Sequence, residues 1–406
     1  MQQTKKGQSF FPSEASRGGL PAWTYDSEEL TELEKEVIFR RNWLLVGHVS
    51  EIPNPGDYKC LDVVDERALV VRGNDGKIRA FHNLCRHRGS RVVTQEFGNC
   101  KNIITCPFHG WSYNLDGSLR GIAFEKSFAG LDKSTHGLKP LEFEIWLGLI
   151  FVRFKGEGAS LSSLVAQFDA ELAPYRIAEM QPYGVSWRQD FDLDWKSIVD
   201  VDNEGYHVPI AHPSLNDLYG HTYSDESFSN GLSRAVGTFG DKPAKLWSVS
   251  NYIKFLPEVE HLPESNRQAW VYFGIFPHTV ITACPDLIEY YQVIPISVRK
   301  SYMCGGTVAL PDERREMSAA RNLNRRINLT TGNEDTQLVK WAWEGMKSSA
   351  FEDIILSDME YGVRACHDEL RRRLPVLNLT EAPALGTLAA RNAELEEQQL
   401  GAAAAL

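Results

Sequence analysis

Two pairs of thiol and imidazole side chains lie close together in NLCRHRGSRVVTQEFGNCKNIITCPFHGW, residues 83–111. The first pair is Cys85 and His87, in the pattern Cys-x-His, and the second is Cys106 and His109, in the pattern Cys-x-x-His. Spacing this short lets a single tight turn direct both side chains of a pair at one small object. Two thiolates and two imidazoles can hold either a zinc ion or an iron–sulfur cluster.

The pairing of unlike ligands distinguishes these two kinds of site. Zinc sites more often pair Cys with Cys and His with His along the chain. In a Rieske 2Fe–2S cluster, two Cys bind one iron and two His bind the other, so each loop supplies one ligand of each kind. Pro107, Gly110 and Trp111 would shape and cover the second loop. The spacing therefore predicts a Rieske cluster held by all four side chains.

A second group of metal-binding side chains lies in WKSIVDVDNEGYHVPIAHP, residues 195–213. On an ideal helix His207 and His212 would point away from one another, but Pro209 between them disturbs that geometry. Two His and a carboxylate form the facial triad of non-haem Fe(II), which leaves positions open for O₂ and substrate. Taken alone, these histidines could equally be packing or surface residues. The carboxylates and imidazoles available are Asp200, Asp202, Glu204, His207 and His212.

The elements that must position these groups differ along the chain. Residues 26–43 have apolar side chains at helical spacing, with Asp26 or Ser27 as the N-terminal cap. Short strand-forming runs follow, and the turn at residues 74–76, Asn-Asp-Gly, indicates a hairpin. A similar strand, turn, strand pattern follows the second ligand pair at residues 112–118. The first ligand group is therefore expected in a small antiparallel domain.

The sequence predicts four segments and an α+β fold. Residues 1–45 form an N-terminal segment with a helix that packs on the catalytic domain, and residues 46–157 form the small antiparallel β domain with the cluster. Residues 158–380 combine helical runs with strands and form a larger, helix-grip-like catalytic domain, in which helices flank a central antiparallel sheet. Residues 381–406 form a C-terminal tail.

Composition excludes some classes of protein. The 406 residues, 43 % of them apolar and 11 % aromatic, suffice for a substantial core in two domains. No run of eighteen apolar residues could span a membrane, and the N-terminus lacks the apolar region of a secretory signal. The net charge of −11 argues against nucleic acid as the main partner. Seven cysteines, two of them committed to a cluster, favour the reducing cytoplasm.

Together, the two groups resemble the catalytic α subunit of the Rieske non-haem iron oxygenases, over roughly residues 20–375. The resemblance implies one 2Fe–2S Rieske cluster and one mononuclear non-haem Fe(II) per subunit, with His207 and His212 as iron ligands. The family pattern W-K-x₃-[DN]-x₃-[DE]-x-Y-H-x₄-H is occupied by Trp195, Lys196, Asp200, Glu204, Tyr206, His207 and His212.

Three acidic residues acquire expected roles from this resemblance. Glu204 matches the acid that bridges the mononuclear site to a cluster histidine of the neighbouring subunit. Asp200 matches a position near the iron that is often Asn. The third iron ligand of the family is a late Asp, for which we expect Asp353, with Asp358 one turn further on as the runner-up.

The resemblance also implies partners. Family members form head-to-tail trimers, and a closed ring supplies the heterologous interface that an electron path between subunits requires. The expected partners are O₂, a small-molecule substrate, and a ferredoxin or a flavin–iron–sulfur reductase that delivers electrons. Neither nucleic acid nor a membrane is expected.

The substrate is indicated by a narrower resemblance. Residues 20–43 and the stretch YHVPIAHPSL look most similar to the quaternary-ammonium oxygenases that demethylate proline betaine (stachydrine), glycine betaine or carnitine. A quaternary ammonium needs an aromatic cage, because cation–π attraction reaches about 2 kcal/mol or more when desolvated. Candidate cage residues are Trp247, Trp270, Tyr272 and Phe276, each of which could instead belong to the sheet core.

We therefore expect hydroxylation of an N-methyl carbon, followed by release of formaldehyde and the demethylated amine. Two alternatives stay open. The first is an aromatic-ring hydroxylase or aryl O-demethylase, in which the same aromatic residues would form a flat apolar slot. The second is a Rieske electron-transfer protein with a vestigial second domain, which would bind only cluster iron.

Overall fold

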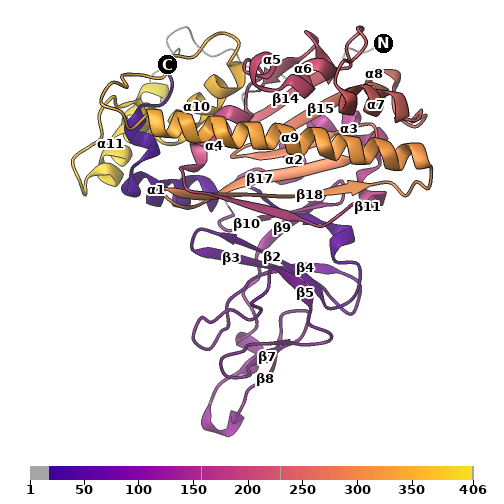
Figure 1. The fold of residues 1–406 in the computed structure, drawn as a ribbon. Coiled ribbons are helices and arrows are strands. Elements are labelled where there is room, and N and C mark those ends of the chain that lie inside the picture. The colour runs from indigo at the N-terminus through magenta and orange to yellow at the C-terminus, as the bar shows by residue number, and fades with distance from the viewer. Residues whose placement is uncertain (1–17, 157, 229, 405–406) are drawn as a thin grey trace. The chain divides into compact units, whose positions relative to one another are not determined.

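A computed structural model of the protein describes residues 18–156, 158–228 and 230–404 (Figure 1). Residues 1–17, the first part of the expected N-terminal segment, lie outside the described residues. The chain divides into two compact units. One contains residues 39–163 and 178–182, and the other contains the chain up to Ile38, residues 164–177 and residues 183 onward.

The smaller unit consists of antiparallel sheets. A three-stranded sheet has the order β1-β10-β9, and a four-stranded sheet has the order β4-β3-β2-β5. A third sheet, β6-β7-β8, carries the chain on both sides of the second Cys–His pair. The strand bounds are β1 Leu44–His48, β2 Asp57–Val63, β3 Glu66–Arg72, β4 Ile78–His82, β5 Phe97–Asn99, β6 Ile104–Thr105, β7 Ser112–Tyr113, β8 Leu119–Gly121, β9 Glu142–Trp146 and β10 Leu149–Arg153.

Turn chemistry explains the hairpins of this unit. The β3–β4 turn closes with a hydrogen bond from the Gly73 amide to the Lys77 carbonyl, and Gly76 adopts a φ of 76°. The β7–β8 turn has Gly117 at a φ of 87°. A left-handed conformation of this kind favours glycine, as the two turn motifs predicted. A single apolar core beneath them includes both Cys ligands.

The larger unit is built on one antiparallel sheet with the order β18-β17-β16-β15-β14-β13, and β12 pairs with β18. Strands β15 to β18 supply many of the fully buried side chains. The strand bounds are β12 Trp187–Phe191, β13 Ser224–Ser227, β14 Leu232–Thr238, β15 Ala269–Ile275, β16 Thr279–Ala283, β17 Ile288–Ser297 and β18 Lys300–Ala309, whereas β11 Gln181–Pro182 belongs to the smaller unit.

Helices pack against this sheet. The 31-residue helix α9 lies across it in Figure 1, and its inward side chains pack in a core with those of α6, α7 and the strands. The helix bounds are α1 Glu28–Glu34, α2 Leu161–Val165, α3 Asp169–Leu172, α4 Trp195–Asp202, α5 Val208–Ala211, α6 Pro213–Tyr219, α7 Trp247–Phe255, α8 Glu264–Arg267, α9 Arg315–Gly345, α10 Tyr361–Arg373 and α11 Leu388–Ala404. An α+β fold with antiparallel sheets and flanking helices confirms the fold class.

The N-terminal helix belongs to the larger unit. Ser27, one of the two expected caps, accepts a hydrogen bond from the Leu30 amide at the start of α1. At its end the Glu34 carboxylate bonds the Lys196 ammonium at 2.7 Å and the Trp195 indole at 2.9 Å, with both charged side chains 1 % exposed. The chain passes between the units at residues 38–39, 163–164, 177–178 and 182–183, and the first two are the crossings nearest to the boundaries at 45–46 and 157–158 expected from the sequence.

Candidate metal centres

The two Cys–His loops have the same construction. In each, a glycine amide closes the turn on the carbonyl of the cysteine at 3.0 Å, from Gly89 to Cys85 and from Gly110 to Cys106. Both glycines have a positive φ, 75° and 71°, which an L side chain rarely adopts. Tight left-handed turns therefore direct the thiol and imidazole of each pair to one side.

The donor atoms meet as like pairs across the loops. The Nδ1 atoms of His87 and His109 are 3.2 Å apart, and the Cys85 and Cys106 thiols are close enough to interact. The two thiols are almost fully buried, whereas both imidazoles are partly exposed. A thiol pair beside an imidazole pair matches a two-iron cluster with Cys₂ on one iron and His₂ on the other.

Residues around the loops hold these ligands in place. The Tyr113 hydroxyl lies 3.2 Å from the Cys85 Sγ and accepts a hydrogen bond from the Arg86 amide. The Trp111 indole is stacked on the His87 ring, with centroids 5.1 Å apart and planes 8° apart. Because hydrogen bonds to sulfur and solvent exposure set the potential of such clusters, Tyr113 and Trp111 are positioned to tune it.

A second centre is formed by His207, His212 and Asp335. These are the residues, among those the structure describes, whose donor atoms converge tightly enough for one metal ion, within 4.8 Å of one another. The Nε2 atoms of the two histidines are 3.0 Å apart, and that of His212 is 2.9 Å from the Asp335 carboxylate. Two imidazoles and a carboxylate match the facial triad of non-haem Fe(II).

Local structure explains why the two histidines meet. They flank the single-turn helix α5, and Pro209 occupies its first turn, where a missing N–H costs nothing. His212 then leaves helical conformation at φ −118° and ψ 80°, and Pro213 starts α6. This short turn places the two rings edge to face with centroids 4.8 Å apart.

Further carboxylates orient both imidazoles. The Nδ1 of His207 contacts the Glu204 carboxylate, and that of His212 lies 2.8 Å from the Glu334 carboxylate. Burial lowers the pKa of His207, but Asp335 and Glu204 outweigh it and raise that pKa to about 9. Carboxylate–histidine–metal arrangements of this kind fix the tautomer and leave Nε2 for the metal.

The structure corrects the expected third ligand. Asp353 is exposed, in a segment without helical structure whose Ile354 carbonyl bonds the Gly19 amide. The runner-up, Asp358, is 71 % exposed and pairs with Arg364. Asp335 holds the position instead, from the middle of α9. No local motif marks a carboxylate inside a long charged helix as a metal ligand. The helical spacing of Asn324, Asn328, Thr331 and Asp335 could nevertheless have predicted that these polar side chains share one face of the helix.

Asp200 is directed away from the iron triad. Its carboxylate accepts a hydrogen bond from the Tyr25 hydroxyl at 2.5 Å and lies 2.8 Å from the Nε2 of His367. The other ring nitrogen of His367 accepts from the Leu20 amide. Asp200 therefore ties the N-terminal segment to α4 and α10, and its expected place near the iron is not supported.

The four expected cage residues have different environments. Trp270 is fully buried and donates to the Tyr252 hydroxyl, while Trp247 is 66 % exposed at the start of α7. Phe276 packs under the Arg373 guanidinium at 4.6 Å. Of the four, only Tyr272 interacts with α4, the helix that precedes the iron histidines. Burial raises the pKa of Tyr272, and the charge of Asp202 on α4 contributes to that rise. The sequence did not single out Tyr223, Glu289 and Tyr291, which share that environment.

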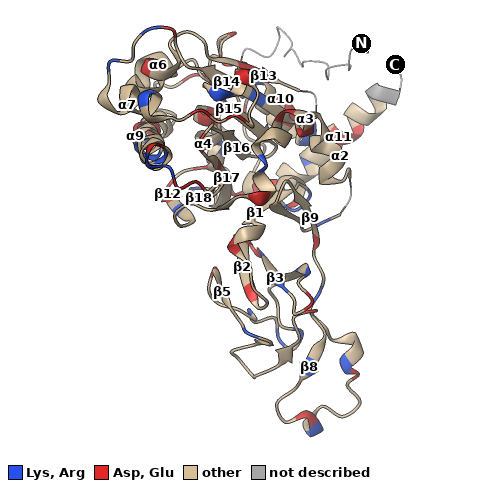
Figure 2. Cartoon of the chain, turned by 90° about the vertical axis from the view of Figure 1, so that its right-hand side faces the viewer, with Lys and Arg blue, Asp and Glu red and all other residues tan. Residues whose placement is uncertain are grey.

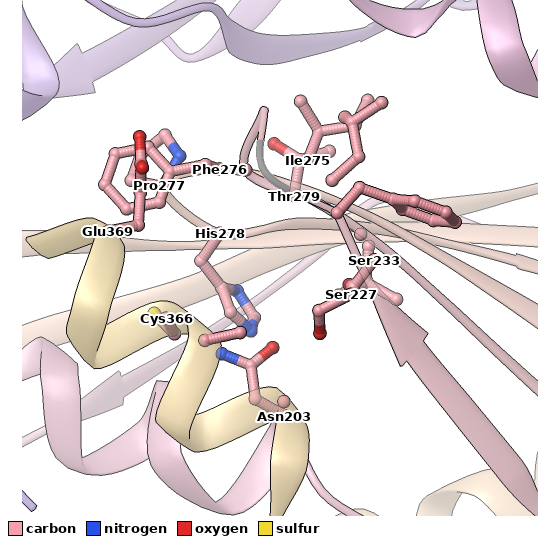
Figure 3. A pocket seen from close by; sticks show the side chains of 17 residues that line it. Asn203, Ser227, Ser233, Ile275, Phe276, Pro277, His278, Thr279, Cys366 and Glu369 are labelled. Atoms are coloured by element: carbon pink, nitrogen blue, oxygen red, sulfur yellow. The ribbon is translucent and has the colours of Figure 1, made fainter. Parts of the chain in front are cut away.

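A separate pocket lies between the sheet and α10 (Figure 3). Its lining includes Asn203, Phe276, His278, Cys366 and Glu369, and in Figure 3 the His278 imidazole points toward Asn203 and Cys366. None of the three triad residues lines it. We therefore do not assign the substrate of the iron centre to this pocket.

Acidic and basic residues are interspersed along the elements of both units (Figure 2). Among the described residues, no helix combines the length and the apolar character needed to cross a membrane. The expectation of a cytoplasmic protein stays a prediction.

Comparison with known protein families supports both kinds of centre. Residues 42–132 match the family described as the Rieske [2Fe-2S] domain, and residues 182–375 match the ring hydroxylating alpha subunit, catalytic domain. The carnitine monooxygenase oxygenase subunit of Acinetobacter pittii is 35 % identical over 304 residues, which are 67 % of this chain and 81 % of that protein. A glycine betaine monooxygenase oxygenase subunit of Chromohalobacter salexigens is 39 % identical over 158 residues, 39 % of this chain and 35 % of that protein.

Solved structures agree in fold. A crystal structure of the quaternary ammonium Rieske monooxygenase CntA superposes with a TM-score of 0.74 at 23 % identity, over 88 % of this chain and 95 % of that one. Another structure of a quaternary ammonium Rieske monooxygenase, described in terms of carnitine oxidation and inter-subunit electron transfer, has a TM-score of 0.72 at 24 % identity, over 86 % and 93 %. Naphthalene 1,2-dioxygenase from Rhodococcus sp. has a TM-score of 0.72 at 21 % identity, over 90 % and 95 %.

Proposed function

Since the chain belongs to the Rieske oxygenase α subunits, with a 2Fe–2S cluster and a mononuclear iron, we propose that it is the terminal oxygenase of an N-demethylating system. It hydroxylates an N-methyl group of a quaternary ammonium or betaine substrate, with proline betaine as one candidate. The observation that carries this proposal is the complete donor set of both centres in a chain similar to carnitine and glycine betaine monooxygenase subunits.

The reaction balances with O₂, two electrons and two protons. One oxygen atom enters the N-methyl carbon as a hydroxyl group, and the other leaves as water. The resulting hemiaminal breaks its C–N bond and releases formaldehyde, the tertiary amine and a proton. The mononuclear iron supplies O₂ activation when bound, and a separate reductase, directly or through a ferredoxin, supplies the electrons to the Rieske cluster.

Side chains of this chain would prepare the reaction. His207, His212 and Asp335 would hold the iron, and Glu204 and Glu334 orient the two imidazoles through Nδ1.

We further propose a homotrimer in which Glu204 bridges a cluster histidine of one subunit and His207 of the next. Two apolar side chains beside the metal centres support a covering partner. Phe108, next to a cluster ligand, is 55 % exposed, and Ile210, between the two iron ligands, is 89 % exposed. Exposed apolar groups at both centres are expected where a second copy of the chain packs on them.

The test is substrate-dependent turnover with a compatible reductase. Proline betaine, glycine betaine, carnitine and a methoxybenzoate would be offered in parallel, and NAD(P)H consumption and formaldehyde would be measured. We expect stoichiometric formaldehyde from one quaternary ammonium compound and none from the aromatic ether. Turnover of aromatic substrates alone would overturn the N-demethylase proposal and leave an aromatic oxygenase, the class to which the neighbouring naphthalene dioxygenase belongs.

A further inference from the structure

A group of carboxylates and tyrosines lies on the sheet face that the iron-bearing helices cover. Its members come from α4, the α6–β13 connection, β13, β15 and β17, all within the larger unit. We call it the carboxylate–tyrosine cluster, and it consists of Asp202, Tyr223, Asp225, Tyr272, Glu289 and Tyr291.

Strand register places Glu289 between two tyrosines on this face. Tyr272 of β15 pairs with Thr282 of β16, and Thr282 pairs with Glu289 of β17. Directly paired residues project to the same side of a sheet, and residues two apart along a strand do as well. Tyr272, Glu289 and Tyr291 therefore share one face.

Side-chain contacts connect this face to the helices that carry the iron ligands. The Tyr291 hydroxyl donates to Asp202 of α4 at 2.9 Å, and the Tyr272 hydroxyl lies 2.7 Å from that of Tyr219 at the end of α6. The Asn328 amide of α9 donates to Glu289 at 3.2 Å.

Helix geometry relates the position of Glu289 to that of the iron triad. Asn328 and Asp335 are seven residues apart on α9, so they lie on the same side of the helix at a rise of roughly 10.5 Å. Thr331 lies between them on this side, and its buried hydroxyl has no hydrogen-bond partner among the described residues. The iron triad and Glu289 therefore border one region beneath α9, about two helical turns in length.

The negative charge of the cluster is poorly compensated. Asp202 lies 2.9 Å from the His278 Nε2, but in the described part of the chain no Lys or Arg pairs with Asp225 or Glu289. One oxygen of Asp225 is buried without a hydrogen-bond partner in the same described residues. Within the described residues, Glu289 accepts a hydrogen bond from the neutral Asn328 amide. A half-buried carboxylate that lies beside two tyrosines and has no paired cation among the described residues is suited to a positively charged ligand.

We propose that Glu289 is the specificity-determining carboxylate of the active site, which receives the positively charged quaternary nitrogen of the substrate. Tyr272 and Tyr291 flank that nitrogen, and an N-methyl group then extends from it toward the iron triad. This inference rests on the proposed function, because it names the residue by which the same site selects a cation. Glu289 contacts the substrate and takes no part in O₂ activation.

Binding of choline and of its neutral isostere tests the proposal without turnover. The isostere is the alcohol in which a carbon atom replaces the quaternary nitrogen of choline. Isothermal titration calorimetry on the metal-loaded protein would compare wild type, Glu289→Gln and Glu289→Asp. We expect Glu289→Gln to weaken choline binding about tenfold or more, as loss of a charge-assisted contact does, and to leave or improve binding of the isostere. Glu289→Asp, which keeps the charge, restores part of the preference.

Glu226→Gln is the matched control. Glu226 directly follows the cluster member Asp225 on β13, but it pairs with Arg234 and its side chain is 40 % exposed. It should leave the preference for choline unchanged. Equal choline affinity in wild type and Glu289→Gln, or no choline binding by wild type, would overturn the inference.

Turnover separates this inference from the proposed function. If wild type demethylates a betaine while Glu289→Gln keeps the same KM and kcat, the function stands and the role of Glu289 falls. If no N-methyl ammonium compound is turned over but choline binding depends on Glu289, the N-demethylase proposal falls and the cation site stands.

Discussion

Asp335 differs from the other acidic residues of α9 in what surrounds it. Its carboxylate is turned toward two imidazole Nε2 atoms, and burial, which would raise its pKa, is outweighed by His207 and His212, which lower it. An ionised carboxylate beside two imidazoles whose Nδ1 atoms are already bonded is prepared for a divalent metal. Binding of the mononuclear iron therefore depends on the donor atoms of these three side chains.

We predict that Asp335→Asn lowers bound iron from about three to about two atoms per chain, because the facial triad is lost and the cluster is kept. Asp353→Asn should keep all the iron, since Asp353 is exposed and away from the histidines. Iron analysis together with the visible spectrum of the cluster measures both. Loss of the mononuclear iron in Asp353→Asn, with full iron in Asp335→Asn, would restore the sequence-based ligand assignment.

The pKa of Glu289 predicts how choline affinity changes with pH. Burial, with a smaller effect from Asp202, raises its pKa to about 7, and the other groups around it are Asn328, Tyr272 and Tyr291. A cation binds the ionised form, which is present above this pKa and lost below it. Choline affinity should therefore fall as the pH decreases from about 8 to about 6.

The matching control is the same titration on Glu289→Gln, which has no ionisable group at this position. Its choline affinity should lose that part of the pH dependence. Identical pH profiles for the two proteins would assign the dependence to another group.

At the scale of elements, α4 and α9 supply side chains to both the iron triad's surroundings and the carboxylate–tyrosine cluster. Helix α4 supplies Asp202 to the carboxylate–tyrosine cluster and leads into Glu204 and the two iron histidines. Helix α9 supplies Asp335 to the iron triad and Asn328 as the partner of Glu289. Close packing keeps this arrangement in register. A Cβ at Gly205 would meet the Tyr223 ring at 2.1 Å, so only glycine lets that ring lie against the ligand-bearing chain.

The start of α4 is fixed by buried charges. Lys196 lies 2.7 Å from Glu34 and 2.9 Å from Asp194, and all three side chains are 1 % exposed. Lys196→Met would leave two buried carboxylates without their cation, and we predict a loss of about 3–5 kcal/mol in the free energy of unfolding. Thermal or denaturant unfolding of the metal-loaded protein measures it.

Arg299→Met is the control for this prediction, because Arg299 pairs with Asp26 at a side-chain exposure of 62 %. An exposed ion pair contributes roughly 1 kcal/mol or less. If Lys196→Met lowers the free energy of unfolding no more than Arg299→Met does, the buried charges of Glu34, Asp194 and Lys196 do not anchor α1.

At the scale of the whole molecule, the proposed trimer makes catalysis depend on two chains. The exposed Phe108 and Ile210 beside the two centres are consistent with an interface there. A heterologous ring repeats the same contact at each junction, so each iron would receive electrons from the cluster of its neighbour.

Mixed trimers test this dependence. Cys106→Ser removes the cluster and Asp335→Asn removes the mononuclear iron, so each variant alone should be inactive. Co-expression in equal amounts should restore activity to about one quarter of wild type, because one junction in four joins an intact cluster to an intact iron. The measurement is formaldehyde release per chain. Inactive mixed trimers with confirmed mixed composition would show that electrons pass within one chain.

Short-range chemistry explains what the sequence by itself determined. The proximity of His87 to His109 and of His207 to His212, the turns at Gly76 and Gly117 and the α+β class all depend on residue types within a few positions of one another. A Cys-x-His or Cys-x-x-His loop closes on itself, and so does the short turn between His207 and His212. Local spacing was enough for them.

Only the tertiary structure decided which distant side chains join these local units. Asp335 reaches the histidines because α9 crosses the sheet, and Glu289 reaches the same region because strand register places it beneath that helix. The sequence placed Asp353 and Asp200 at the iron, yet the fold turns one to solvent and binds the other to Tyr25 and His367. Packing between elements determines which of many similar carboxylates lies beside the iron histidines, and the sequence around each carboxylate does not identify it.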